Sequence, residues 1–146
     1  MTYGGWAGHD PAGCAAWCSA FLRARGFVVD LTDTLDPLTD PGYAAGLDLV
    51  VPVWSLADAP AAPLDALVGA VSAGVGLAAV HGAAAAFDAH RGYRRMLGGS
   101  FVWHPEEREF VVDCAGGDSF RIFTEQYHLH VDPANEMVAR TRLCDG

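Results

Sequence analysis

Apolar runs alternate with segments of helical apolar spacing along the first two thirds of this chain. The short apolar runs predict buried β-strands, with only a stub at the start, at 1–3, 27–31, 47–54 and 75–80. Apolar positions at i, i+3, i+4 and i+7 predict helices at 11–25, 63–73 and 83–97. The first helix has Asp10 as a candidate N-cap and Pro11 at its first position. Strands that alternate with helices of roughly ten to fifteen residues favour right-handed βαβ crossovers and a mostly parallel sheet.

The last third of the chain has shorter and less regular apolar runs. A loop with a short extended piece is expected at 98–105, and short strands are expected at 110–114, 120–123, 127–131 and 136–142. The whole pattern predicts an α/β fold, and ligands of open α/β sheets bind outside the carboxyl ends of the strands. The segments to search for a site are therefore those that follow strands, at 4–11, 54–60, 81–86 and 98–105.

A histidine occupies the position at which an α/β enzyme normally carries its nucleophile. The apolar run 75–80 ends abruptly in His81-Gly82, and the alanines at 83–86 offer a helix start. Strand, sharp turn and helix form a nucleophile elbow, which presents one side chain at the carboxyl edge of a parallel sheet. An imidazole there suits acid/base work, ligand binding or metal ligation. The alternative is that His81 hydrogen-bonds neighbouring loops and shapes the turn.

Three further polar side chains are candidates for the same edge. His9 lies in a glycine-rich loop before a helix, where a ligand can approach the backbone; alternatively it only fixes that loop. Glu125 is a candidate carboxylate base near His81. His104 precedes Pro105, which favours an extended conformation and would let it join the site. We predict that His81, Glu125 and His9 form the catalytic set.

A histidine pair in the densest polar segment of the chain raises the question of a metal. His128 and His130 would share one face of an extended strand, a spacing at which two side chains can chelate one ion. Ordinary strand alternation with solvated histidines is the alternative. His90, in the middle of the predicted helix 83–97, is expected on a solvated helix surface.

Composition and charge argue against several classes of protein. The chain has 146 residues, of which 51% are apolar, enough for one core and too apolar for a disordered chain. Its formal charge of −9, with nine arginines and no lysine, argues against a nucleic-acid site, which needs a basic face. No apolar stretch reaches the roughly 18 residues that span a bilayer, and residues 1–10 lack the features of a signal peptide. A cytoplasmic location is the default expectation.

The four cysteines do not form a recognisable metal or disulfide pattern. Cys14 and Cys18 are four residues apart and share one face of a helix, whereas Cys114 and Cys144 stand alone. The spacing is not that of a zinc ribbon. We therefore predict small buried residues in a reduced protein.

Five motifs follow one another along the chain: GGWAGHDP at 4–11, LDLVVPVW at 47–54, GVGL at 74–77 leading into His81-Gly82, GGSFVWHP at 98–105 and EQYHLHVDP at 125–133. In this order and spacing they resemble the trehalose-utilisation (ThuA-like) family, which has the class I glutamine-amidotransferase-like fold. The resemblance implies a flavodoxin-like three-layer α/β sandwich with a mostly parallel sheet. It also implies a single domain over 1–146 that is shortened at both ends relative to the family pattern.

The resemblance further implies a role in the catabolism of disaccharides and their 3-keto derivatives. Trp6, Trp54, His104 and Tyr127 then become candidate substrate-binding residues, because aromatic faces stack on the apolar faces of sugar rings. For the two tryptophans the alternative is that they cover the core. True glutamine amidotransferases carry a cysteine at the elbow, and this chain carries His81. A cysteine-dependent glutaminase is therefore not expected.

Two functions from different classes remain open. In the first, the protein acts on a disaccharide or keto-sugar derivative as an isomerase, lyase or hydrolase, with His81 as acid/base or ligand residue. The cofactor is unknown, and a divalent metal such as zinc is a variant that would polarise a keto oxygen. In the second, the chain is a non-catalytic sugar-binding or structural domain that has lost activity. A small-molecule sugar is the expected partner in both, and an exposed edge strand would allow a homo-oligomer.

Overall fold

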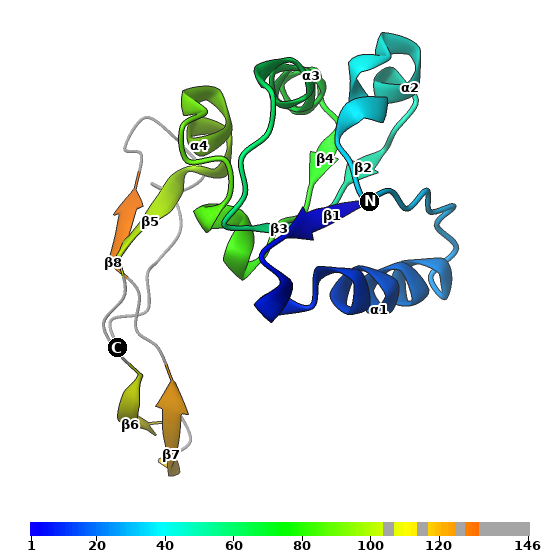
Figure 1. Cartoon of the computed structure of the whole chain (residues 1–146). Helices are drawn as coiled ribbons and strands as arrows, with labels where there is room; N and C mark the ends of the chain where they lie inside the picture. The colour runs from blue at the N-terminus through cyan, green and yellow to red at the C-terminus, as the bar shows by residue number, and fades with distance from the viewer. Residues whose placement is uncertain (104–106, 114–116, 125–127, 132–146) are drawn as a thin grey trace.

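The computed structural model describes residues 1–103, 107–113, 117–124 and 128–131. Helices and strands alternate along the first hundred residues, and strands follow one another after that, as Figure 1 shows. The elements are β1 (Thr2–Gly5), η1 (Ala7–His9), α1 (Pro11–Arg23), η2 (Asp36–Thr39), α2 (Pro41–Ala45), β2 (Leu49–Val50), β3 (Pro52–Ser55), α3 (Ala61–Ser72), β4 (Gly76–Leu77), η3 (His81–Ala85), α4 (Arg91–Leu97), β5 (Gly99–Trp103), β6 (Arg108–Asp113), β7 (Ser119–Thr124) and β8 (His128–Val131). The η elements are short 3₁₀ turns.

All strand pairing in the first part of the described chain is parallel. β1 pairs with β3, and β2 pairs with β4. Only Val51 separates β2 from β3, and its carbonyl accepts a hydrogen bond from the N–H of Thr2 at 3.1 Å, whereas the carbonyl of Val50 accepts one from Ala78 at 3.1 Å. Because successive carbonyls of a strand point to opposite sides, β1 and β4 flank this segment on opposite edges. A parallel bridge joins the outer side of β1 to Thr32.

Helices cover both faces of these parallel strands. In Figure 1, α1 lies on one face, and α2 and α3 lie on the other. The second face carries the main hydrophobic core, formed by Leu35, Leu38, Val50, Leu64, Leu67, Ala86, Phe87 and Tyr93. The α/β prediction is confirmed in this part of the molecule, and the ends of β1, β3 and β4 come together at one edge.

The first helix forms where the sequence predicted it, but its large apolar side chains face outward. The Asp10 carboxylate accepts the N–H of Gly13 at 3.2 Å, which confirms the N-cap. Contact with the sheet is made by the small residues Ala15 and Ser19, both buried. Small residues allow a close approach of helix and sheet. Trp17 points away from the sheet, and 68% of it is exposed.

The cysteine prediction is wrong for the first of the four cysteines. Cys14 is exposed and Cys18 is half-buried, and both are free thiols. Ala15 and Ser19 take the buried positions of α1 instead. Cys114 and Cys144 lie outside the described residues.

Three predicted elements near the sheet differ from the structure. The strand expected at 75–80 is reduced to Gly76–Leu77 (β4). Segment 27–31 is not a strand. Arg23 donates to the carbonyl of Val29 at 2.7 Å, and β1 reaches the segment through the Met1 amino group, which donates to the carbonyl of Asp30 at 2.6 Å. The predicted helix 83–97 is divided into η3 and α4. Its middle is interrupted by Phe87 at φ 54° and by His90, whose Nδ1 accepts the N–H of Tyr93 at 3.0 Å and so caps α4.

His90 itself is half-buried rather than solvated, and its Nε2 lies 3.2 Å from the Asp65 carboxylate. The imidazole therefore joins the start of α4 to α3, and the expected position in the middle of a helix is wrong.

The last third of the chain pairs in the antiparallel sense. β5 pairs with β8, and β6 pairs with β7. Strands expected at 110–114, 120–123 and 127–131 are confirmed within a few residues, and the loop expected at 98–105 contains β5. Figure 1 shows the β6–β7 hairpin well away from the parallel strands. The strand expected at 136–142 lies outside the described residues.

Candidate functional site

A hollow of about 530 Å³ opens at the carboxyl ends of β1 and β3. Its polar end consists of His9, Ser55 and His81, and its wall continues along α1. The three polar residues come from three separate loops or strand ends, so only the parallel register brings them together. This is the position that the α/β pattern predicted for a site.

His9 is held by a buried serine. Its Nδ1 lies 2.9 Å from the Oγ of Ser55, and only 3% of Ser55 is exposed. Ser55 is itself fixed, because its carbonyl accepts the N–H of Trp6 at 2.9 Å. Gly5, at φ 89°, is required beside it: a Cβ there would collide with the Ser55 carbonyl. The bond to Ser55 occupies Nδ1 and leaves Nε2 as the ring nitrogen of His9 that can serve a ligand.

His81 starts the η3 turn in a left-handed backbone conformation, at φ 43°. The next residue, Gly82, is buried, and a Cβ on it would collide with the Cβ of Ser55. The turn is also held from the core, because the Tyr93 hydroxyl donates to the carbonyl of Ala83 at 3.1 Å. Burial raises the pKa of Tyr93 above its ordinary value, so this hydroxyl remains a donor across the physiological range.

The two imidazoles meet edge to face. The ring centroids of His9 and His81 are 5.0 Å apart with an interplanar angle of 65°. Trp6 contacts His9 on one side, at 4.7 Å between centroids, and Phe101 contacts His81 on the other, at 6.0 Å. An aromatic ring thus borders each histidine and limits the orientations it can adopt.

Backbone strain is concentrated around this pair. Within the described part of the chain, four non-glycine residues have positive φ: Asp10, Leu56, His81 and Phe87. Three of them are His81 itself and the residues that directly follow His9 and Ser55. Non-glycine residues in this conformation cost of order 1–3 kcal/mol each and cluster at functional sites. His81 thus has the left-handed backbone of a sharp turn, but the predicted elbow is only partly formed, because β4 ends at Leu77 and a 3₁₀ turn rather than an α-helix follows His81.

The structure brings together part of the predicted site. His81 and His9 are adjacent, and Trp6 lies beside them, half exposed. Trp54 lines the same hollow, but its Nε1–H donates to the Thr2 hydroxyl at 2.7 Å and its ring packs on Phe87 at 5.4 Å. The indole of Trp54 therefore covers the core as well as bordering the site.

Other predicted site residues fall in the last third of the chain. His104, Glu125 and Tyr127 lie outside the described residues. His128 and His130 are both in β8, where the strand places them opposite Trp103 and Ser100 of β5. Among the residues that the structure describes, no group of three or more histidine, cysteine, aspartate or glutamate side chains could hold a metal ion.

Ser55 is a site residue that the sequence interpretation missed. It is the first polar residue after the apolar run 47–54, at the carboxyl end of a predicted strand, and this placement was an available signal. Its partner His9 could not be named from the sequence, because the contact depends on the register that sets Gly5 opposite Ser55.

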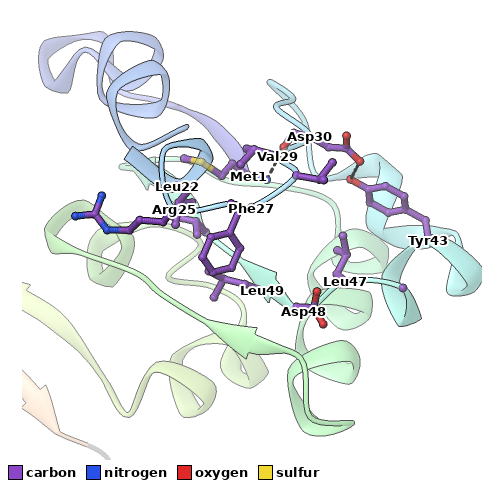
Figure 2. Close-up of a pocket in the computed structure, with 14 residues that line it drawn as sticks. Met1, Leu22, Arg25, Phe27, Val29, Asp30, Tyr43, Leu47, Asp48 and Leu49 are labelled. Carbon is purple, nitrogen blue, oxygen red and sulfur yellow. Dashed lines mark hydrogen bonds between the residues drawn. The ribbon is translucent and has the colours of Figure 1, made fainter. Parts of the chain in front are cut away.

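A second hollow, of about 550 Å³, lies at the amino ends of the same strands. Figure 2 shows its walls, with Phe27 beside Leu49 and the Tyr43 ring turned toward Asp30. The Tyr43 hydroxyl is 3.4 Å from the Asp30 carboxylate. Partial burial, and to a lesser degree that carboxylate, raise the pKa of Tyr43. No histidine, cysteine or serine lines this hollow, so we place the candidate site at the other end.

The described helices include none that is long and apolar enough to span a membrane.

The parallel strands with helices on both faces and a histidine pair at their carboxyl ends define an α/β protein with a strand-end site. A model of the ThuA family, described as trehalose utilisation, matches residues 1–144. The chain therefore belongs to this family, as its motifs indicated, and the family implies a role in trehalose utilisation. Comparison with curated proteins gave no match. Comparison with solved structures gave none either.

Proposed function

We propose that this protein binds or transforms a disaccharide or keto-sugar derivative in the hollow between His9 and His81, with His81 as the acid/base or ligand residue. The observation that carries the proposal is the meeting of two imidazoles, 5.0 Å apart, at the carboxyl ends of parallel strands. The parallel order of the Thr32 segment, β1, β2–β3 and β4 supports a flavodoxin-like sandwich around this site.

The chemistry suits a pair of imidazoles. A 3-keto sugar has acidified protons next to its carbonyl, and isomerisation or elimination starts with the removal of one of them. Imidazole changes charge near neutral pH, so one ring can accept that proton while the other donates to the developing oxyanion. Ser55 fixes the orientation of His9, and the left-handed turn fixes the position of His81.

The remaining predicted residues complete the proposal. Glu125 would supply a carboxylate that sets the protonation of His81, and His104 and Tyr127 would contact the substrate together with Trp6 and Trp54. A divalent metal held by His128 and His130 is the variant in which a Lewis acid polarises the keto oxygen.

A binding domain without turnover is the second candidate. The exposure of His81 and the open α1 wall favour it, because water has access to the space beside the imidazoles. Enzymes that handle reactive intermediates usually exclude water from the site. Substrate binding with no turnover in the wild-type protein would select this candidate.

The deciding experiment is the His81→Ala substitution, assayed by NMR with the 3-keto derivatives of trehalose and of simple glucosides. We expect turnover to fall by about 10²–10⁴-fold, with an unchanged circular-dichroism spectrum and a thermal midpoint near that of wild type. His90→Asn is the matched control, because asparagine keeps a cap on α4 and His90 does not line the hollow. Turnover that survives in His81→Ala, or a large loss of stability with no separate loss of turnover, would contradict the acid/base role.

A further inference from the structure

The hollow at the histidine pair extends along an apolar wall that the proposed chemistry does not use. The wall is lined by Cys14, Trp17 and Cys18 of α1 and by Val53 and Val80. Trp17 and Val80 are 68% and 73% exposed. The wall is therefore a surface of large apolar side chains that opens directly onto the imidazoles.

Trp17 is held in place by its own helix. Its ring stacks on that of Phe21, one turn further on, with centroids 5.6 Å apart and an interplanar angle of 22°. The Arg25 guanidinium lies 3.4 Å from the Phe21 ring centroid, and it also donates to the Phe21 carbonyl at 3.1 Å. The column Trp17–Phe21–Arg25 thus orders the indole before any ligand arrives, which reduces the entropy lost when a ligand packs on it.

The distribution of polar atoms in the hollow separates two parts of a ligand. The side-chain hydrogen-bonding groups of His9, Ser55 and His81 lie at one end, beside Asp10 at the start of α1. A hydroxyl-rich ring fits that end, where its oxygens find partners. Along the wall of Trp17, Val53 and Val80 the hydroxyls of a second sugar would find few side-chain partners, the Trp17 indole N–H and the two thiols, whereas an aryl or alkyl group would gain from burial against it.

We infer that the ligand is a glycoside, or keto-glycoside, with an apolar aglycone, and that the α1 wall is the aglycone subsite with Trp17 as its platform. This inference rests on the proposed function, since it assumes that the sugar ring lies at the histidine pair. We therefore expect aryl or alkyl glycosides to bind more tightly than disaccharides. Trp17 then determines specificity and takes no part in the acid/base step.

The test compares ligands that differ only in the aglycone, using the whole chain. Binding of phenyl and methyl α-glucoside, of their 3-keto derivatives and of trehalose is measured by isothermal titration calorimetry. We expect the phenyl compounds to bind about tenfold more tightly than the methyl compounds, the size of effect that one stacked aromatic ring supplies. Trehalose should resemble the methyl compounds.

Two variants test the wall itself. Trp17→Ala should remove most of the phenyl preference and leave methyl-glucoside affinity within about twofold. Val80→Ala should also reduce the phenyl preference, because it removes apolar surface from the wall and adds no charge beside His81. Phe123→Ala is the matched control, because Phe123 is also 68% exposed but lies on β7, away from the hollow. It should change neither affinity.

Each other outcome overturns a distinct statement. Equal binding of phenyl and methyl compounds would overturn the aglycone subsite and leave the sugar site in place. Tighter binding of trehalose than of the phenyl compounds would assign the wall to a second sugar ring instead. A phenyl preference that persists in both wall variants would place the aglycone elsewhere. Failure of every sugar to bind the folded wild-type protein would overturn the proposed function and the subsite with it.

Discussion

The two hollows at opposite ends of the parallel strands have similar volumes, about 530 and 550 Å³, and very different chemistry. The carboxyl-end hollow holds two imidazoles, one of them bonded to a buried serine. The amino-end hollow of Figure 2 holds exposed carboxylates and one tyrosine. Volume therefore does not identify the site. What distinguishes the carboxyl end is the number of contacts that fix its polar side chains.

The difference has a structural cause. At the carboxyl end, tight turns follow β1 and β3 and a further turn begins at His81. Left-handed residues at Asp10, Leu56 and His81 place neighbouring side chains in one small space. At the amino end, segment 27–31 does not join the sheet, and Val28 is 97% exposed. A rigid frame of turns thus surrounds one hollow, whereas a segment outside the sheet borders the other. If this contrast in rigidity is real, substitutions at the carboxyl end should have larger effects than matched substitutions elsewhere.

The largest effect is expected from Gly82→Ala. The new Cβ would collide with that of Ser55 and lie 3.2 Å from Nδ1 of His9, so either the η3 turn or the serine must move. A displacement of this kind costs about 1–3 kcal/mol of stability and about 10²-fold in turnover if it misplaces the histidines. Chemical denaturation and the keto-sugar assay measure the two effects.

Gly69→Ala is the matched control for this substitution. Gly69 lies within α3, and a Cβ there would have nothing within 4 Å. We expect a gain in stability of roughly 0.5–1 kcal/mol, since alanine is the better helix former, and no change in turnover. If Gly82→Ala is as harmless as Gly69→Ala, the close contact between the η3 turn and Ser55 does not exist in solution.

A smaller effect is expected from Tyr93→Phe. Loss of the hydroxyl leaves the buried carbonyl of Ala83 without this donor, at a cost of about 1–2 kcal/mol. Tyr43→Phe, at the amino-end hollow, removes a hydroxyl 3.4 Å from an exposed carboxylate. It should change the free energy of unfolding by less than about 0.5 kcal/mol. Equal effects of the two substitutions in urea denaturation would show that the two ends are equally rigid.

The local sequence pattern predicted the helices whose positions depend on residue spacing and capping. The helical spacing and the Asp10 cap gave α1 its position, and the apolar spacing at 63–73 gave α3. The run 75–80 and its abrupt end placed His81 at a strand end beside His9. The general rule of parallel sheets gives this edge for both histidines, whereas the contact between their rings depends on the register.

Contacts between residues far apart in the sequence explain the elements that the local patterns predicted wrongly. Segment 27–31 has the composition of a strand, but a side chain, that of Arg23, donates to its Val29 carbonyl. The helical pattern at 83–97 is interrupted because His90 caps a new helix. The apolar stripe of α1 faces outward because Ala15 and Ser19 pack on the sheet. In each case a tertiary contact overrides a sound local preference.

The smallest effect is expected in the alkaline limb of the stability curve. Burial raises the pKa of Tyr93, so the folded protein keeps this proton while the unfolded chain loses it above a pH of about 10. The unfolded state then binds fewer protons, and the free energy of unfolding must fall as the pH rises beyond that point.

Tyr93→Phe should show a shallower fall of the free energy of unfolding with pH than wild type. Tyr43→Phe should fall between wild type and Tyr93→Phe, because the pKa of Tyr43 is also raised, through a burial that is only partial and through the Asp30 carboxylate. Urea midpoints measured between pH 8 and 11 test this prediction. If wild type and Tyr93→Phe show the same pH dependence, Tyr93 is not enclosed in solution, and its hydroxyl does not support the His81 turn from the core.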